Sequence, residues 1–136
     1  MTNETVQNNA GVAGPGKAMN IVLWILQILG AAMFLMAGVS KLTGAEQMVG
    51  MFDAIGVGQW FRYVTGGIEV VSAILLLIPR LAGVGALLLI PTMIGAILTH
   101  LFIVGGSPVV PIVLLMIMAI IAYGRRDRTL KLLFGE

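Results

Sequence analysis

The sequence predicts an all-α integral membrane protein, a four-helix bundle with both termini in the cytoplasm. Charged residues make up only 10% of the 136 positions, against about 25% in an ordinary soluble domain, and apolar residues reach 59%. The apolar residues also fall in long runs, and two of these runs exceed the about 20 residues that a spanning helix needs. A water-soluble enzyme is excluded, because so few charges could not cover the surface of such a fold.

The two ends of the chain differ from this apolar middle. Residues 1–17 are polar, have little to bury and predict a disordered tail. Residues 18–124 predict a single transmembrane domain. Residues 125–136 mix basic and apolar side chains, which indicates a basic amphipathic cytoplasmic tail on anionic lipids, although an ordinary stop-transfer flank has the same composition. The net charge of +2 is too small to indicate a nucleic-acid partner.

Four apolar segments predict the spans. They are residues 19–42, 64–79, 81–104 and 109–123. The first and third are long enough to cross a bilayer unaided. The second and fourth are shorter and would span if they begin in the membrane interface, the second of them at Trp60. Because the later connections are very short, consecutive helices must be antiparallel neighbours.

The longest connection, residues 43–59, predicts a short amphipathic helix between spans one and two. Thr43 and Glu46 have the spacing of a capping box. Apolar residues then follow at helical spacing, namely Met48, Met51, Phe52 and Ile55. We expect this helix to lie on the membrane or over the mouth of the bundle.

Basic residues predict the orientation. Six of the eight lie on the side of the termini, namely Lys17, Arg80, Arg125, Arg126, Arg128 and Lys131. Only Lys41 and Arg62 lie on the other side. The excess of basic residues marks the cytoplasmic side, so the amphipathic connection should face outward.

Three ionisable residues lie at a similar depth near the outer interface. At 1.5 Å per residue, Glu69 lies about 10 Å inward from Arg62. His100 lies about 7 Å inward from Gly105 by the same rise, and Lys41 ends the first span. A charge within the bilayer costs at least ~2.5 kcal/mol, so each such residue needs a reason. The sequence therefore predicts a polar pocket near the outer leaflet.

Simpler interpretations exist for two of these residues. Lys41 at a helix end can extend its ammonium group to the interface, and a lone His100 can satisfy one interhelical hydrogen bond. Glu69 lies too deep for its carboxylate to reach the interface. Its position favours a functional group or a buried pair holding the bundle together. Secondary candidates are Asp53, Arg62, Thr92 and Thr99. With one His and no Cys, the chain alone offers no zinc site of the usual composition and no bis-His haem ligation, so we predict no metal site.

The order of these motifs resembles the DoxX family of small bacterial membrane proteins. The resemblance covers roughly residues 28–123 and rests on the helix ending Ala-Gly-Val-Ser-Lys-Leu at 37–42, the Gly-Gly-Ile-Glu at 66–69 and the helix ending at His100. It implies a multi-pass protein of the bacterial inner membrane and carries over Gly38 and Gly67 as helix-packing positions.

The family takes its name from a subunit of a thiosulfate:quinone oxidoreductase, and many members are classed as oxidoreductases on that analogy. The resemblance thus implies a redox-associated subunit whose Lys41, Glu69 and His100 pocket takes a quinone-like ligand. No catalytic residue is assigned, because the chain has no redox-active side chain of its own. One alternative is a non-enzymatic scaffold or assembly partner for another membrane or redox protein. A weaker one is a small-solute transporter acting as a homo-oligomer. The lipid bilayer is the remaining expected partner.

Overall fold

The computed structural model describes residues 14–135, and all regular structure in this range is helical, which confirms the predicted all-α class. Six α-helices follow in order: α2 (Lys17–Leu42), α3 (Glu46–Ile55), α4 (Trp60–Leu76), α5 (Ala82–Thr99), α6 (Val109–Gly124) and α7 (Arg126–Phe134). A π-helical turn, η1 (His100–Val104), continues α5 directly. Of the tail expected at residues 1–17, the part up to residue 13 lies outside the described residues, and Lys17 already begins α2.

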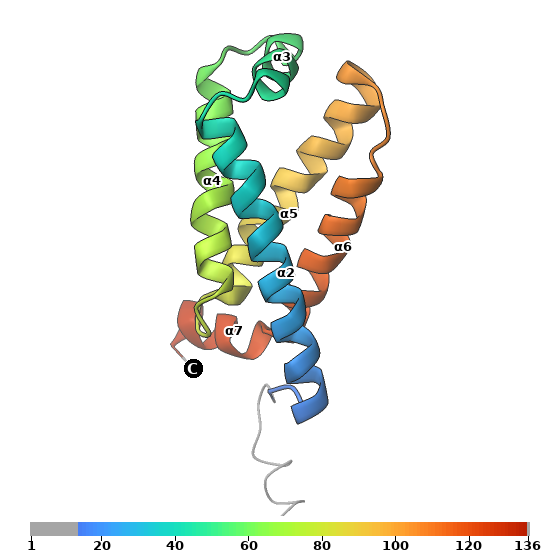
Figure 1. Cartoon of the computed structure of the whole chain (residues 1–136). Helices are drawn as coiled ribbons and strands as arrows, with labels where there is room; N and C mark the ends of the chain where they lie inside the picture. Colours follow the sequence, from blue (N-terminus) through green and yellow to red (C-terminus); the bar gives the residue numbers. More distant parts are fainter. Residues whose placement is uncertain (1–13, 136) are drawn as a thin grey trace, which may run out of the picture.

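Four of these helices, α2, α4, α5 and α6, pack in a ring. In it α2 contacts α4, α4 contacts α5, α5 contacts α6 and α6 contacts α2 (Figure 1). The short helix α3 lies over one end of the ring, and α7 crosses the other (Figure 1). We call these the α3 end and the α7 end.

Within residues 14–135, two helical segments are long and apolar enough to cross a membrane. They are α2 and the continuous segment Ala82–Val104 formed by α5 and η1. A third candidate span exists only if α6 and α7, which meet at a bend of 64°, form one span. Length and composition alone do not establish α4 and α6 as spans, because they have 17 and 16 residues.

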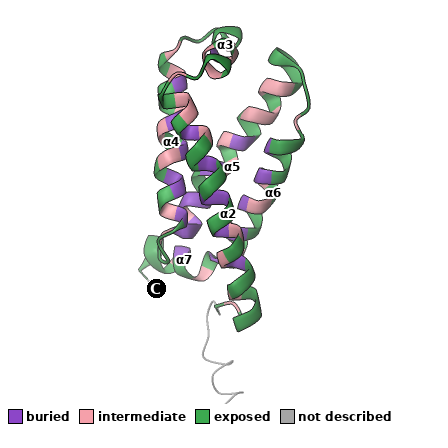
Figure 2. Ribbon diagram, in the orientation of Figure 1, coloured by how far each residue is buried: buried purple, intermediate pink, exposed green. Residues whose placement is uncertain are grey.

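The apolar core occupies the middle of the ring and its half toward the α7 end, as the purple residues of Figure 2 show. All four ring helices contribute to it, with Phe34, Leu76, Leu89 and Met118 fully buried. Beyond Met93, by contrast, no residue of α5 or η1 is buried. The ring is therefore well packed toward α7 and thinly packed toward α3.

The connection between α2 and α4 forms the predicted amphipathic helix, with Phe52 buried on its inward face. The predicted capping box is wrong. Ala45 is the residue before α3, and no side chain caps the helix. The Thr43 hydroxyl instead donates to the Val39 carbonyl at 2.7 Å, because the free carbonyls at the end of α2 lie closer to it. The third apolar segment also departs from one uniform helix, since its winding changes at His100.

Candidate functional site

The α3 end is organised by a close approach of α2 and α4. A Cβ atom at Gly38 would lie 2.8 Å from the Gly66 carbonyl oxygen, and one at Gly66 would lie 3.0 Å from that of Gly38. Such contacts require glycine on both helices. The packing position on α4 is Gly66 and not Gly67 as predicted, because a Cβ at Gly67 would meet no neighbouring atom. The two glycines differ by 100° around the helix, and only one can face α2.

Beside this crossing, the two antiparallel helices are also joined by an ion pair, whose partners each lie three residues after the glycine of their own helix. The Lys41 Nζ lies 2.9 Å from the Glu69 Oε1, and the two side chains are 12% and 2% exposed. Within residues 14–135, no other group donates a hydrogen bond to this carboxylate. The structure therefore brings two of the three predicted pocket residues together. Their pairing lowers the cost of placing either charge among apolar side chains.

Arg62, a secondary candidate, closes the end of α2. Its guanidinium is buried and donates through Nη1 to the Lys41 carbonyl oxygen and through Nε to the Gln59 Oε1, the latter at 2.7 Å. The Gln59 amide in turn donates to the Asp53 Oδ1 at 2.9 Å and to the Val49 carbonyl at 3.0 Å. These bonds tie α3 and α4 to the backbone of Lys41. Sequence reasoning missed Gln59, because a neutral amide in a connection carries no distinctive pattern.

The remaining candidates bond within their own helix. The half-buried His100 has its Nδ1 2.9 Å from the Ala96 carbonyl oxygen. Thr92 and Thr99 likewise donate to the carbonyls four residues earlier, at 2.9 and 2.8 Å. In the described part of the chain, none of the three makes a hydrogen bond or ion pair with Lys41 or Glu69. The third pocket residue therefore lies at the same end of the ring, on a different helix, with its Nε2 free of any hydrogen bond from residues 14–135.

A second polar cluster, at the α7 end, was not foreseen. The Arg125 guanidinium is 3% exposed, and it donates to the Gln27 Oε1 at 2.6 Å and to the Asn20 Oδ1 at 2.8 Å. The Gln27 amide donates to the Leu76 carbonyl at 2.8 Å, so α2, α4 and the α6–α7 junction are joined. The signal was present, since two amides seven residues apart interrupt an otherwise apolar run. Arg125 itself was interpreted only as one of the basic residues that predict the orientation.

The described chain thus defines a class: a small helical bundle with two segments long and apolar enough to cross a membrane and an ion pair between its first two long helices. Residues 25–130 match the DoxX-like family, and the chain belongs to that family. It is also 29% identical over 83 residues to a Bacillus subtilis (strain 168) protein named "Putative oxidoreductase CatD". This alignment covers 61% of the present chain and 62% of the relative, less than two thirds of its length. No solved structure matches the chain.

Proposed function

We propose that this chain is a four-span protein of the bacterial inner membrane that acts as a redox-associated subunit and binds a quinone-like ligand at its α3 end. In this topology α4 and α6 are short spans beginning in the interface. Both termini are cytoplasmic and the α3 end faces outward, because most basic residues gather at the α7 end. Reporter fusions at residue 136 and near Gly56 test this arrangement, and reports from the same side would contradict it.

The observation that carries the proposal is the ion pair of Lys41 and Glu69. Ionisable residues inside membrane segments are costly and concentrate at functional sites. A pair used only to hold two helices is dispensable, since apolar residues of similar volume often stabilise a protein as well. The name of the Bacillus subtilis relative adds support for a redox association.

The side chains at this end suit a quinone head group chemically. Quinone carbonyl oxygens accept hydrogen bonds, and a lysine ammonium group has three donors, of which Glu69 occupies one. His100 has a second ring nitrogen with no hydrogen bond from residues 14–135. The half of α5 beyond Met93 is not packed against a core, so His100 has freedom to approach a ligand. These residues therefore fit the group.

The four polar residues of the proposed site divide the work of binding, positioning and proton transfer. Lys41 and His100 would donate to the two carbonyl oxygens of the head group, and Glu69 would orient Lys41 and accept a proton. Arg62 would position Lys41 through its backbone carbonyl. A histidine can exchange protons near neutral pH, which suits a reaction that couples electrons and protons. The bound quinone would supply the redox chemistry that no side chain of this chain provides.

The test is binding of a short-chain ubiquinone analogue to the full chain in lipid nanodiscs. We expect Glu69→Gln and His100→Gln each to weaken binding about tenfold. A tenfold loss corresponds to the loss of one well-placed hydrogen bond. Thr92→Val is the matched control, because Thr92 bonds only to its own helix. No binding by the unmodified chain, or equal binding by all three variants, would overturn the proposal.

A second candidate is a non-enzymatic scaffold. It is favoured by the closed geometry of the site, in which Glu69 already satisfies Lys41 and His100 bonds to its own helix. Native mass spectrometry of the detergent-extracted protein separates the two functions. Retained quinone supports the subunit, whereas a retained protein partner without quinone supports the scaffold. The same spectrum shows whether the chain forms a homo-oligomer.

A further inference from the structure

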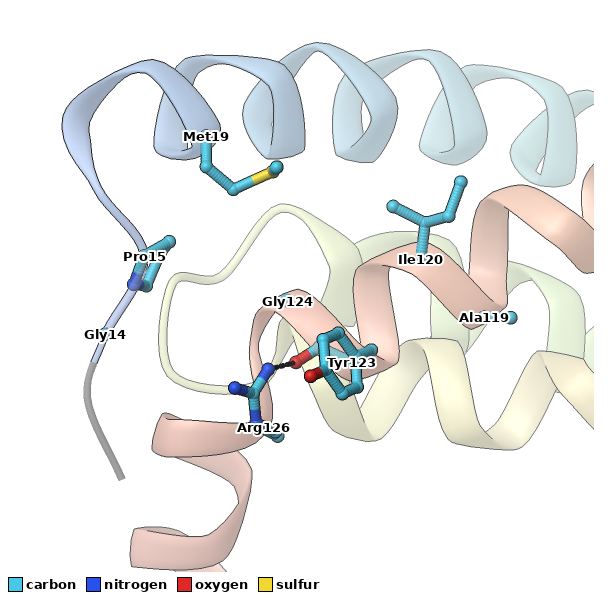
Figure 3. A pocket seen from close by; sticks show the side chains of 8 residues that line it. All are labelled: Gly14, Pro15, Met19, Ala119, Ile120, Tyr123, Gly124 and Arg126. Carbon is cyan, nitrogen blue, oxygen red and sulfur yellow. Dashed lines mark hydrogen bonds between the residues drawn. The ribbon is translucent and has the colours of Figure 1, made fainter. Parts of the chain in front are cut away.

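A cavity of about 510 Å³ lies at the α7 end, between the first turns of α2 and the last turns of α6 (Figure 3). Its apolar walls come from Pro15 and Met19 on one side and from Ala119 and Ile120 on the other. Its volume falls within the about 300–1,000 Å³ typical of small-molecule sites. The cavity is far from the α3 end, so the ligand proposed there has no part in it.

The polar rim of this cavity carries a positive charge with free donors. Arg126 lies 3.9 Å over the Tyr123 ring, and its Nη1 donates to the Tyr123 carbonyl oxygen at 2.6 Å (Figure 3). Its other donors make no hydrogen bond within residues 14–135, and the side chain is exposed. A guanidinium held by a ring and a carbonyl is positioned to bind phosphate oxygens.

The surroundings of the rim place it at the level of lipid head groups. After a bend of 64°, α7 leaves the direction of α6. It exposes basic Arg128 and Lys131 together with Leu133 and Phe134, which are 59% and 70% exposed. A short helix with both kinds of side chain exposed lies in the interface plane of a bilayer. The charge of this helix favours anionic lipids.

We propose that the cavity binds one anionic phospholipid, with an acyl chain along the walls of Met19 and Ile120 and the phosphate group on Arg126. A bound phospholipid accounts for both the apolar walls and the guanidinium at the rim. An apolar cavity open beside a membrane takes hydrocarbon, and the fixed guanidinium at its mouth selects a head group with a net negative charge. A zwitterionic lipid has a phosphate but carries a cation beside it, which is disfavoured by Arg126 and by α7, where three basic residues outweigh Asp127.

The experiment is native mass spectrometry of the full chain released from nanodiscs of equal amounts of phosphatidylglycerol and phosphatidylcholine with the same acyl chains. We expect one retained phosphatidylglycerol per chain, with at least a tenfold preference over phosphatidylcholine. Arg126→Gln should reduce retention about tenfold, the loss of one charge-assisted hydrogen bond. Arg128→Gln is the matched control, because it removes the same charge from the same helix but does not line the cavity.

A second pair of variants tests the apolar walls. Ile120→Trp fills the cavity and should abolish retention, whereas Ile112→Trp, at an exposed position at the other end of α6, should leave it unchanged. Equal retention of both lipids would overturn the proposal. Equal losses with Arg126→Gln and Arg128→Gln would overturn it too, because they would show general attraction to a basic surface. Helicity measured by circular dichroism confirms that each variant is folded.

Discussion

The two ends of the ring handle buried charge in different ways. At the α7 end, Arg125 is bonded to Gln27 and Asn20, and three parts of the chain are joined through them. At the α3 end, an ion pair and the Arg62 bond to the Lys41 carbonyl join α2 to α4, and the facing half of α5 has no buried residue. The polar groups hold helices together at both ends, but only at the α3 end does half of a ring helix lack buried residues. Ligand-binding regions are commonly drawn from the less stable parts of a fold.

The largest stability loss should come from the α7 end. Gln27→Leu leaves the Nε of the buried Arg125 without its acceptor, with only the bond to Asn20 remaining, and the Leu76 carbonyl without a donor. We expect a loss of about 3 kcal/mol in the free energy of unfolding, measured by denaturation in detergent, since unsatisfied buried groups cost about 1–3 kcal/mol each and charged ones more. Gln47→Leu, at an exposed position on α3, is the control and should have little effect. Equal losses would remove the distinction between the two ends.

The ion pair of the α3 end should come next. Glu69→Ala should cost about 2 kcal/mol, less than a fully buried pair, because the Lys41 side chain is 12% exposed and can extend to the interface. The double variant Lys41→Met with Glu69→Met should recover most of this loss in the same unfolding measurement. A double variant as unstable as Glu69→Ala would show that the charges themselves stabilise the ring.

A smaller effect should follow from closing the gap between α2 and α4. Gly38→Ala places a Cβ against the Gly66 carbonyl, and overpacking of this kind should cost about 1.5 kcal/mol. Gly67→Ala adds the same atom into open space and should be neutral or slightly stabilising, since alanine favours helix. Thermal unfolding of the two variants compares them directly. A greater loss with Gly67→Ala would mean that α4 is rotated about its axis.

The smallest stability loss should be that of His100→Gln. The histidine bonds only to its own helix, so about 0.5–1 kcal/mol is expected from thermal unfolding. Its effect on function should be much larger, because glutamine cannot exchange protons near neutral pH. Complementation of a deletion strain by the variant measures this. Full complementation would favour the scaffold.

The similar depth of Lys41 and Glu69 could be predicted from the sequence because depth along a helix follows directly from residue count, while the partner of Glu69 was left open between Lys41 and His100. Rotation about the helix axis follows less directly, and for this reason the packing glycine on α4 was placed at Gly67 and not at Gly66. The same limit applies to His100, whose distance from the pair depends on how far α5 diverges from α4. Nothing in the order of apolar residues encodes that divergence.

The cluster at the α7 end escaped prediction for a different reason. Arg125 and Gln27 are 98 positions apart, and only the closed ring brings them together. A basic residue after a span normally indicates orientation, so its burial could not be expected. The Asn20 and Gln27 amides face one side of α2, and this regular spacing was the available clue.

We propose that the α3 end is loosely packed and becomes ordered around its ligand. The chain has no native cysteine, so introduced cysteines can be spin-labelled selectively at exposed positions. Double electron–electron resonance would compare one pair at Val64 and Phe102 with another at Ile74 and Leu87. We predict a narrow distance distribution for the second pair, and for the first a broad one that narrows when a short-chain ubiquinone analogue is added. Two equally narrow distributions that the analogue leaves unchanged would contradict the claim.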